Sequence, residues 1–330
     1  MERKGTMTEK TIRLGIIGYG NLGKGAVLAI RQNPDLALTG IFTRRDPSTI
    51  DASSPVYAVS ELERFRGAID VCLLCGGSAR DLDRQGPDAV RHFHTVDSFD
   101  THARIPAYYE TMDAAARASG HLALISVGWD PGLFSLIRLF EEAVLPVGDT
   151  VTFWGKGVSQ GHSDAIRQIP GVAAAVQYTI PLDDAIDRVR QGDTPSSRER
   201  HRRDCFVVLE DGADAESITQ RIVTMPHYFS DYDTTVTFVS REELAARHSG
   251  MPHGGRVMRR GQTTPGTHQS IDFSLKLDSN PEFTASILVA AARAVHRMAT
   301  GGQTGAITLF DVPPGYLSAR SAEDLRKSLL

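Results

Sequence analysis

The chain has 330 residues, of which 41% are hydrophobic and 23% are charged, and its formal net charge is −4. This length exceeds what one hydrophobic core ordinarily fills, so we expect a globular protein of two domains. The slightly acidic balance offers no basic stripe to a nucleic acid, and no apolar run approaches the ~18 residues that a membrane-spanning helix needs, so we expect neither partner.

The N-terminus and the cysteines both indicate a cytoplasmic protein. Residues 1–10, MERKGTMTEK, lack the apolar core of a secretory signal. The three cysteines, Cys72, Cys75 and Cys205, are too few for a disulfide framework. Cys72 and Cys75 form a C-x-x-C inside a run that is typical of a strand, where residues i and i+3 point to opposite faces. We therefore expect neither a redox pair nor a zinc site there.

The first 130 residues alternate between strand and helix patterns. In chain order, the predicted strands occupy 11–20, 37–44, 68–77, 94–100 and 121–132, and the predicted helices occupy 21–33, 81–93 and 105–120. This alternation predicts an α/β domain with a parallel, doubly wound sheet of the Rossmann type.

Strand-like runs dominate after a predicted helix at 133–145. They occupy 149–155, 174–181, 205–210, 234–240, 255–262 and 268–277, with a helix at 214–225. They predict a second, α+β domain on a largely antiparallel or mixed sheet.

Two further stretches bear on how the domains divide. The polar stretch 192–204, which contains proline and serine, is expected to be a mobile loop, and the alanine-rich stretch 281–302 is expected to be a helix. Because that helix leads the chain back toward the first domain, we expect domains at 1–130 and 131–297, with 298–330 returning to the first.

The segment GYGNLG places Gly18, Gly20 and Gly23 directly between a predicted strand and a predicted helix. The first glycine permits a tight turn, the second lets the backbone approach a pyrophosphate, and the third lets helix and strand pack closely. The helix N-terminus then offers free N–H groups to phosphates. This context predicts a dinucleotide site.

Thr43, Arg44 and Arg45 follow the second predicted strand, where an NAD site would carry a carboxylate for the ribose hydroxyls. A guanidinium can instead clamp a 2′-phosphate bidentately. Two hydrogen bonds to charged groups, at roughly 1.5–3 kcal/mol each, would favour NADP by about a hundredfold or more. The arginine pair therefore predicts NADP, with a solvated basic turn as the alternative.

Other strand ends of the first domain carry small or acidic residues. CGGS, 75–78, would let the backbone approach a dinucleotide, with an ordinary turn as the alternative. Asp97, Asp100 and Asp130 follow two further strands and would face the same crevice. Such carboxylates can hold a substrate ammonium group, although each can equally serve as a helix cap or turn residue.

Two histidines of the second domain lie in polar stretches. His162 stands beside Ser163 and Asp164, a typical helix N-cap cluster, so a structural role is favoured over that of a base. His253 lies among turn formers in MPHGG, which favours a ligand contact or an exposed loop. Without H-E-x-x-H or a paired C-x-x-C we expect no metal, and without G-x-S-x-G a hydrolase has no support.

Several segments in chain order together resemble the meso-diaminopimelate dehydrogenase family. They are IRLGIIGYGNLG, IFTRR, TVDSFDTH, SVGWDPG, FWGKGVSQGHSDAIRQIPGV, RDCFVV, GMPHGG and LKLDSNPEFTAS. The resemblance covers nearly the whole chain and implies reversible, NADP-dependent oxidative deamination of the D-centre of meso-2,6-diaminopimelate. The products would be L-2-amino-6-oxopimelate (tetrahydrodipicolinate), ammonia and NADPH, in lysine biosynthesis. The resemblance also implies a homodimer, with 131–297 serving substrate binding and dimerisation.

The glycine motif and the resemblance assign site residues. The expected cofactor contacts are Gly18, Tyr19, Gly20, Asn21, Leu22, Gly23, Thr43, Arg44, Arg45, Cys75, Gly76, Gly77, Ser78, Ser98, Phe99, Asp100, Val127, Gly128, Trp129, Asp130 and Pro131. The expected substrate contacts are Asp100, Asp130, Trp154, Gln160, Thr179, Arg203, His253 and Asn280. Gly76 and Val127 depart from the family's pattern, which leads us to expect a larger residue and a threonine.

The resemblance implies different roles for different residues of this set. Asp100 and Asp130 are the expected catalytic residues, which accept hydrogen bonds from the reacting ammonium group, and Trp154 donates to the nearby carboxylate. The expected contacts of the distant L-centre are Arg203, His253, Thr179 and Asn280. Asp100 is the preferred general base, with a carboxylate-held water as the alternative.

Other functions remain open at this point. Another NADP-dependent D-amino acid dehydrogenase, or a related two-domain NADP oxidoreductase such as a semialdehyde dehydrogenase, fits the same architecture. The semialdehyde enzyme would need a lysine or cysteine at the reacting centre, and Cys75 is the only thiol placed to serve. A catalytically inactive NADP sensor would keep the glycines and arginines but have no use for the substrate contacts.

Overall fold

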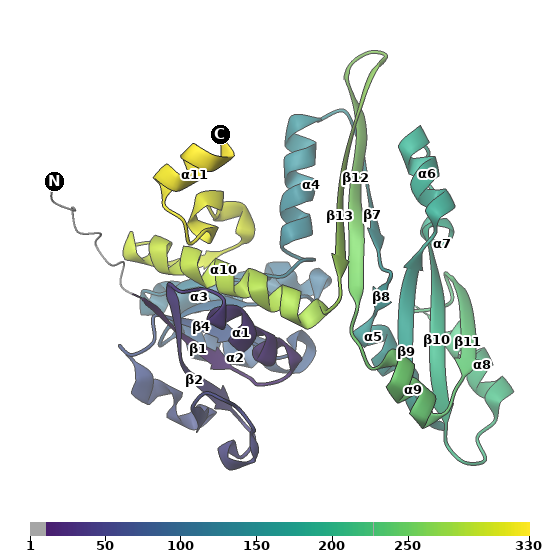
Figure 1. Ribbon diagram of the computed structural model, residues 1–330, viewed down its shortest axis with the longest axis horizontal. Coiled ribbons are helices and arrows are strands. Elements are labelled where there is room, and N and C mark those ends of the chain that lie inside the picture. The colour runs from purple at the N-terminus through teal and green to yellow at the C-terminus, as the bar shows by residue number, and fades with distance from the viewer. Residues whose placement is uncertain (1–10, 227) are drawn as a thin grey trace. The chain divides into compact units, whose positions relative to one another are not determined.

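The computed structural model describes residues 11–226 and 228–330 (Figure 1). Residues 1–10, on which the expectation about a secretory signal rests, lie outside the described residues. The chain forms two compact units, one that ends at Leu136 and resumes over Pro281–Leu330, and one that spans Ile137–Asn280. The boundaries therefore differ from those expected at 130 and 297. The long C-terminal helix counts with the first unit because its alanine-rich face is buried in that unit's core.

The first unit is built on a seven-stranded sheet in the order β14-β6-β5-β4-β1-β2-β3, with every neighbouring pair parallel. Its strands are β1 Ile12–Ile17, β2 Leu36–Thr43, β3 Val56–Ala58, β4 Val71–Leu74, β5 His94–Asp97, β6 Leu122–Leu124 and β14 Gly305–Ile307. The predicted α/β, doubly wound fold is confirmed. The C-terminal segment returns to this sheet as its edge strand, β14.

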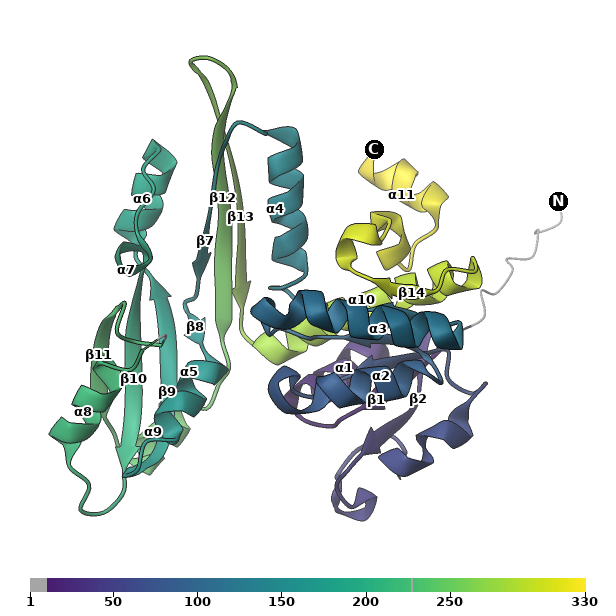
Figure 2. The ribbon, with the colours of Figure 1, turned by 180° about the vertical axis from the view of Figure 1, so that it is seen from behind.

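Helices cover both faces of the parallel sheet (Figures 1 and 2). They are α1 Asn21–Arg31, α2 Asp83–Val90, α3 Ile105–Ser119 and α10 Asn280–Thr300, with α11 Ala322–Leu329 at the C-terminus. α1 and α10 pack with Ile16 and Leu73 in one core, whereas α2 and α3 pack with Phe42 and Leu74 in the other. Burying apolar area on both faces stabilises the sheet by ~25 cal/mol per Å².

Cys72 and Cys75 lie on opposite faces of β4 and the turn that follows it, Cys72 in the core with α2 and α3, Cys75 in the core with α1 and α10. Both thiols are buried, and burial raises the pKa of Cys75 to about 12. The predicted opposition of the two sulfurs is confirmed.

Arg293 anchors the long helix α10 to the N-terminal part of the same unit. Its side chain is only 2% exposed. The guanidinium pairs with Asp35 at 2.5 Å and donates to Asn33 Oδ1 and to the carbonyl oxygen of Leu317, each at 2.8 Å. This contact lowers the pKa of Asp35. A buried guanidinium is tolerated because its donors are satisfied.

The second unit carries two sheets, where the sequence led us to expect one. An antiparallel sheet has the order β13-β12-β7, and a mixed sheet has the order β11-β10-β9-β8, in which only β10 and β11 are parallel. The strands are β7 Gly148–Trp154, β8 Gly157–Val158, β9 Val172–Pro181, β10 His201–Leu209, β11 Asp233–Phe238, β12 His253–Thr264 and β13 Thr267–Leu277.

The helices of the second unit pack on these sheets. They are α4 Leu133–Val144, which begins in the first unit, α5 Gln160–Arg167, α6 Asp183–Gln191, α7 Ser197–Arg200, α8 Ala215–Val223 and α9 Arg241–His248. α5 and α8 share a core with β9 and β10, whereas α6 packs against β7 and β12. In the described residues, no helix combines the length and the apolar character that crossing a bilayer requires.

The expectation of a mobile loop over 192–204 is wrong for most of that stretch. α7 begins after Ser196, whose hydroxyl accepts from the backbone of Glu199 while the Glu199 carboxylate accepts from the backbone of Ser196. Such a capping box stabilises a short helix. The following residues form the first part of β10, paired with β9 on one side and β11 on the other.

Candidate active site

The glycine turn between β1 and α1 has the geometry that close approach of a phosphate requires. Gly18 has φ +98°, and a Cβ on Gly23 would lie 2.1 Å from the carbonyl oxygen of Gly18. A Cβ on Gly20 would meet nothing within 4 Å. The turn is therefore packed against its own strand at Gly18 and Gly23 and open to a ligand at Gly20, as the roles of the glycines predict.

A cavity of about 370 Å³ lies beside this turn, wholly within the first unit. The expected cofactor contacts that line it are Gly18, Tyr19, Gly20, Thr43, Arg44, Arg45, Cys75, Gly76 and Gly77. Arg45 donates to the carbonyl oxygen of Tyr19 at 2.7 Å, and its backbone N–H donates to Thr43 Oγ1 at 3.1 Å. The glycine turn and both arginines thus surround one space, as a dinucleotide with a 2′-phosphate requires.

Other residues of this cavity were not predicted. They are Ile17, Phe42, Val59, Asp81 and Gln85. Of these, Asp81 bears most directly on cofactor binding, because its carboxylate pairs with Arg44 at 2.7 Å. It reaches the cavity because the chain after Ser78 forms a turn of π-helix, Ser78–Leu82, before α2 begins. The only sequence feature that could have pointed to Asp81 is that it is an acidic residue directly after the segment CGGSAR.

Asp97 is a buried carboxylate at the end of β5 that joins two of the expected cofactor loops. One oxygen accepts from the backbone N–H groups of Phe99 at 2.9 Å and Ser126 at 3.0 Å, and the other accepts from the Tyr108 hydroxyl at 2.9 Å. Ser126 has a left-handed backbone, φ +57°, which is costly for a residue other than glycine. Burial raises the pKa of Asp97 to about 6. Asp97 therefore holds the loops in place, and the expectation that it faces the crevice beside Asp100 and Asp130 is wrong.

The two loops that Asp97 joins carry the remaining contacts expected in the first unit. Asp100 is exposed, and its backbone N–H donates to Ser78 Oγ at 2.9 Å. Phe99 and Val127 are fully buried, so neither offers an exposed side chain to a ligand. Trp129 is also buried and packs edge-on against Phe134. The other expected contacts are Asn21, Leu22 and Gly23 in the first turn of α1, Ser98 after β5, and Gly128, Asp130 and Pro131 after β6.

In the second unit, Arg203 has a buried guanidinium with a spare donor, by which we mean an N–H group that has no hydrogen-bond partner among the described residues. Its side chain is 7% exposed, and its Nε is buried without a hydrogen-bond partner among the described residues. One terminal nitrogen donates to the hydroxyl of Thr179, its partner in the β9–β10 ladder, and the guanidinium carbon lies 4.0 Å from the centroid of the Tyr232 ring. Burial lowers the pKa of Arg203. Leaving such a donor unpaired is costly, so a carboxylate is the ligand that this position favours.

The other substrate contacts expected in this unit lie at the ends of neighbouring elements. Trp154 ends β7, has a 40% exposed side chain and donates its backbone N–H to His201 Nε2 at 2.9 Å. His253 begins β12 and packs against Gly157, which pairs with Thr179. The structure therefore brings Trp154, Thr179, Arg203 and His253 to one region where the two sheets adjoin. Gln160 and Asn280 begin α5 and α10.

His162 is packed as a structural residue. Its Nδ1 lies 2.7 Å from Ser159 Oγ, and its ring packs edge-on against Tyr228 and Phe229. Burial, together with nearby Arg203, lowers its pKa to about 4. A neutral, enclosed imidazole agrees with the structural role that the sequence favoured.

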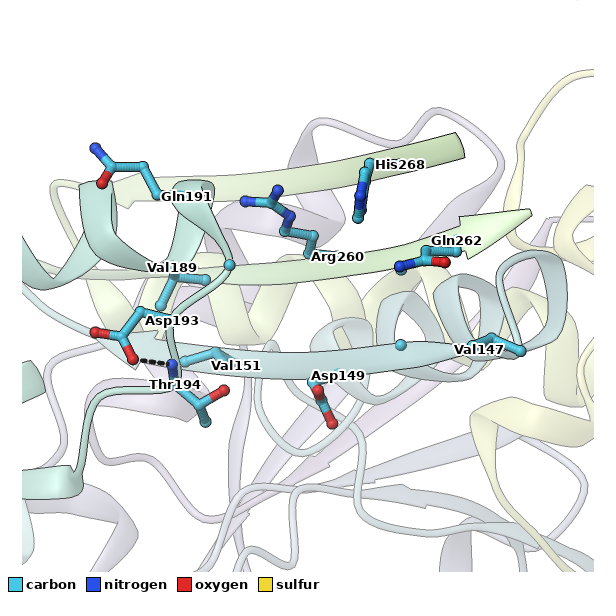
Figure 3. A pocket seen from close by; sticks show the side chains of 13 residues that line it. Val147, Asp149, Val151, Val189, Gln191, Asp193, Thr194, Arg260, Gln262 and His268 are labelled. Atoms are coloured by element: carbon cyan, nitrogen blue, oxygen red, sulfur yellow. Dashed lines mark hydrogen bonds between the residues drawn. The ribbon is translucent and has the colours of Figure 1, made fainter. Parts of the chain in front are cut away.

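A second hollow of about 430 Å³ lies in the other unit, between α6 and the β7–β12 pair (Figure 3). Arg260 extends from β12 and donates to the carbonyl oxygen of Arg190, and Asp193 accepts from the backbone of Thr194 at 2.7 Å. None of the expected substrate contacts lines it. For that reason we do not include it in the candidate site.

The chain is similar to known proteins over nearly its whole length. A family model described as the diaminopimelic acid dehydrogenase C-terminal domain matches residues 128–279. The chain is 58% identical over 323 residues to the meso-diaminopimelate D-dehydrogenase of Lysinibacillus sphaericus, which covers 97% of this chain and 99% of that protein.

Two solved structures share the fold over 97% of this chain and the whole of theirs. One is a six-substitution variant of the meso-diaminopimelate dehydrogenase of Clostridium tetani E88 with diaminopimelate, at a TM-score of 0.93 and 51% identity. The other is an engineered D-amino acid dehydrogenase bound to NADP+, at a TM-score of 0.87 and 43% identity.

Replacing Asp97 tests its role as the joint between the two loops. Asp97→Ala leaves two backbone N–H groups and a hydroxyl unpaired in the core, and we expect it to lower the free energy of unfolding by about 3 kcal/mol or more, at roughly 1–3 kcal/mol per group. Asp97→Asn keeps an acceptor for the two N–H groups and should lose much less. Urea unfolding followed by circular dichroism measures both; equal losses in the two variants would contradict the role.

Proposed function

The chain belongs to the meso-diaminopimelate D-dehydrogenase family, and on that premise we propose that it oxidises the D-centre of meso-2,6-diaminopimelate with NADP. Substrate, water and NADP+ give L-2-amino-6-oxopimelate, ammonia, NADPH and a proton, and the reaction is reversible. The observation that carries the proposal is the buried guanidinium of Arg203 with its spare donor. The other unit of the same chain holds a glycine turn and two arginines around one cavity. We also propose that the protein works in the cytoplasm, in lysine biosynthesis.

The residues of the cavity beside the glycine turn fit NADP. Gly20 leaves open space where the pyrophosphate would approach the N-terminus of α1. Arg44 is 70% exposed at the cavity and can turn to a 2′-phosphate, while Arg45 is held by the carbonyl oxygen of Tyr19. When bound, NADP+ supplies the acceptor for the hydride of the D-configured carbon.

The substrate has two ammonium and two carboxylate groups, so its site needs both signs of charge. In the first unit, Asp100 and Asp130 accept hydrogen bonds from the reacting ammonium group. In the second unit, Trp154 donates to the adjacent carboxylate, Arg203 pairs with the distant one, and the remaining contacts are Gln160, Thr179, His253 and Asn280. An amino acid without the second carboxylate would leave Arg203 unpaired, which disfavours it.

Asp100 takes the proton from the reacting amine in this proposal. Its side chain is exposed on the loop after β5, and its backbone is held by Ser78 Oγ. A water held by the carboxylates is the alternative base. Asp97 is excluded from that role because both its oxygens already accept hydrogen bonds in the core.

Thiol chemistry at Cys75 has little support. Burial raises the pKa of this thiol to about 12, so almost none of it is thiolate at neutral pH, and the thiolate is the nucleophile. A semialdehyde dehydrogenase that uses Cys75 is therefore disfavoured.

We propose that the protein is a homodimer, and an apolar strip on α4 supports this. Leu139, Phe140 and Val144 on α4 and the nearby Val147 are 47–66% exposed. Clustered large apolar side chains at a protein surface are typical of interfaces.

The stereochemistry of the substrate gives the first test of the function. The purified protein should reduce NADP+ with meso-diaminopimelate, followed at 340 nm, and should be inactive with the LL isomer, which has no D-centre. Equal rates with the two isomers would contradict the proposed stereochemistry, and no reaction with either would contradict the activity.

Arg203→Met tests the contact to the distant carboxylate. Losing a charge-assisted hydrogen bond should raise the Michaelis constant for meso-diaminopimelate by about tenfold to a hundredfold, with that for NADP+ unchanged. Arg202→Met is the matched control, because Arg202 is the exposed neighbour on the same strand. Equal effects of the two substitutions would remove Arg203 from the substrate site.

Phe140→Asp tests the proposed dimer. A charge on the apolar strip should shift the protein from dimer to monomer in sedimentation velocity. Phe310→Asp is the control, because Phe310 is similarly exposed, at 56% against 62%, on the first unit. A monomeric wild type, or a Phe140→Asp protein that stays dimeric, would contradict the proposal.

A further inference from the structure

The arginine that is expected to clamp the 2′-phosphate already has an anionic partner. A terminal nitrogen of Arg44 lies 2.7 Å from a carboxylate oxygen of Asp81, and the side chains are 70% and 18% exposed, respectively. Both residues line the cavity beside the glycine turn. The inference below rests on the proposed use of a nicotinamide dinucleotide and deepens it.

Asp81 is held where it stands by contacts on its other side. Its second carboxylate oxygen accepts from the backbone N–H of Gly77 at 3.0 Å. Its Cβ packs so close to Gly76 that a Cβ on that glycine would lie 2.8 Å from it, and 2.5 Å from Gln85 Oε1. The absence of a side chain at Gly76 therefore leaves the space that Asp81 occupies. The carboxylate is fixed and Arg44 is the mobile member of the pair.

A fixed carboxylate in this cavity acts differently on the two nicotinamide dinucleotides. A 2′-phosphate must share Arg44 with Asp81 and lies near a like charge, which costs free energy. A free ribose hydroxyl meets the kind of acceptor that NAD sites use. In those sites the acid follows the second strand, whereas here Arg44 and Arg45 follow it and the acid comes from the turn before α2.

We propose that Asp81 is a specificity-determining residue that tempers the preference for NADP over NAD. It competes with the 2′-phosphate for Arg44 and offers an acceptor to the ribose hydroxyls of NAD. The chain consequently binds NAD more tightly, relative to NADP, than its two arginines alone would allow.

Equilibrium binding of both dinucleotides to Asp81→Asn tests the proposal. Asparagine keeps an oxygen that can accept from Gly77 N–H, so the turn is retained while the charge is removed. By isothermal titration calorimetry, NADP+ should bind about threefold to tenfold more tightly than to the wild type, and NAD+ somewhat more weakly. The ratio of the NAD+ to the NADP+ dissociation constant should therefore rise.

Asp88→Asn is the matched control, because it removes the same charge from a residue that pairs with Arg84 and Arg91 and not with Arg44. It should leave the ratio of the NAD+ to the NADP+ dissociation constant unchanged. Gly76→Ala provides a second variant, since its methyl group displaces Asp81 and should raise the ratio in the same direction. An unchanged or lower ratio in Asp81→Asn would overturn the proposal.

Because no amino acid is present in the titration, the result does not depend on which substrate is oxidised. A wild type that binds neither dinucleotide would contradict the proposed cofactor and overturn the role of Asp81 with it. A wild type that binds both, yet fails to oxidise meso-diaminopimelate, would contradict only the proposed function.

Discussion

The candidate site in the first unit depends on one buried carboxylate. Asp97 accepts three hydrogen bonds beneath the ends of β5 and β6, and through them it fixes the loop that carries Asp100 and the loop that carries Asp130. Ser126 keeps its left-handed backbone in the presence of this contact, and such strain persists only where the surroundings determine it. Two loops at different strand ends, which carry the proposed cofactor contacts, are thereby held by a single fully buried group.

The distribution of charge in the rest of the chain follows the chemistry that the proposed substrate requires. Exposed or half-buried carboxylates stand on the loops of the first unit, and a buried guanidinium with a spare donor stands in the second. Around the glycine turn the signs are mixed, because Asp81 stands against Arg44. Cofactor choice in this protein is therefore a balance between a cation and an anion, and not a property of the arginine pair alone.

Much of the first unit could be predicted from the sequence because its signals are local. Alternating strands and helices predict a parallel sheet, and GYGNLG predicts the turn whose packing at Gly18 and Gly23 the structure shows. In the second unit, strand patterns identify strands but not their partners, so the division into two sheets was missed. The capping box at Ser196 was overlooked in a polar stretch. The contact of Asp81 with Arg44 and the inward turn of Asp97 depend on tertiary packing, which no short motif records.

A crystal structure of the protein with NADP+ and meso-diaminopimelate together would test the central claim most directly. The account predicts the amine of the D-centre within hydrogen-bond distance of Asp100 or Asp130, the distant carboxylate on the guanidinium of Arg203, and Asp97 still buried beneath the two loops. Carboxylates of Asp100 and Asp130 that both point away from the bound amine, or an Arg203 without an anionic partner, would contradict it.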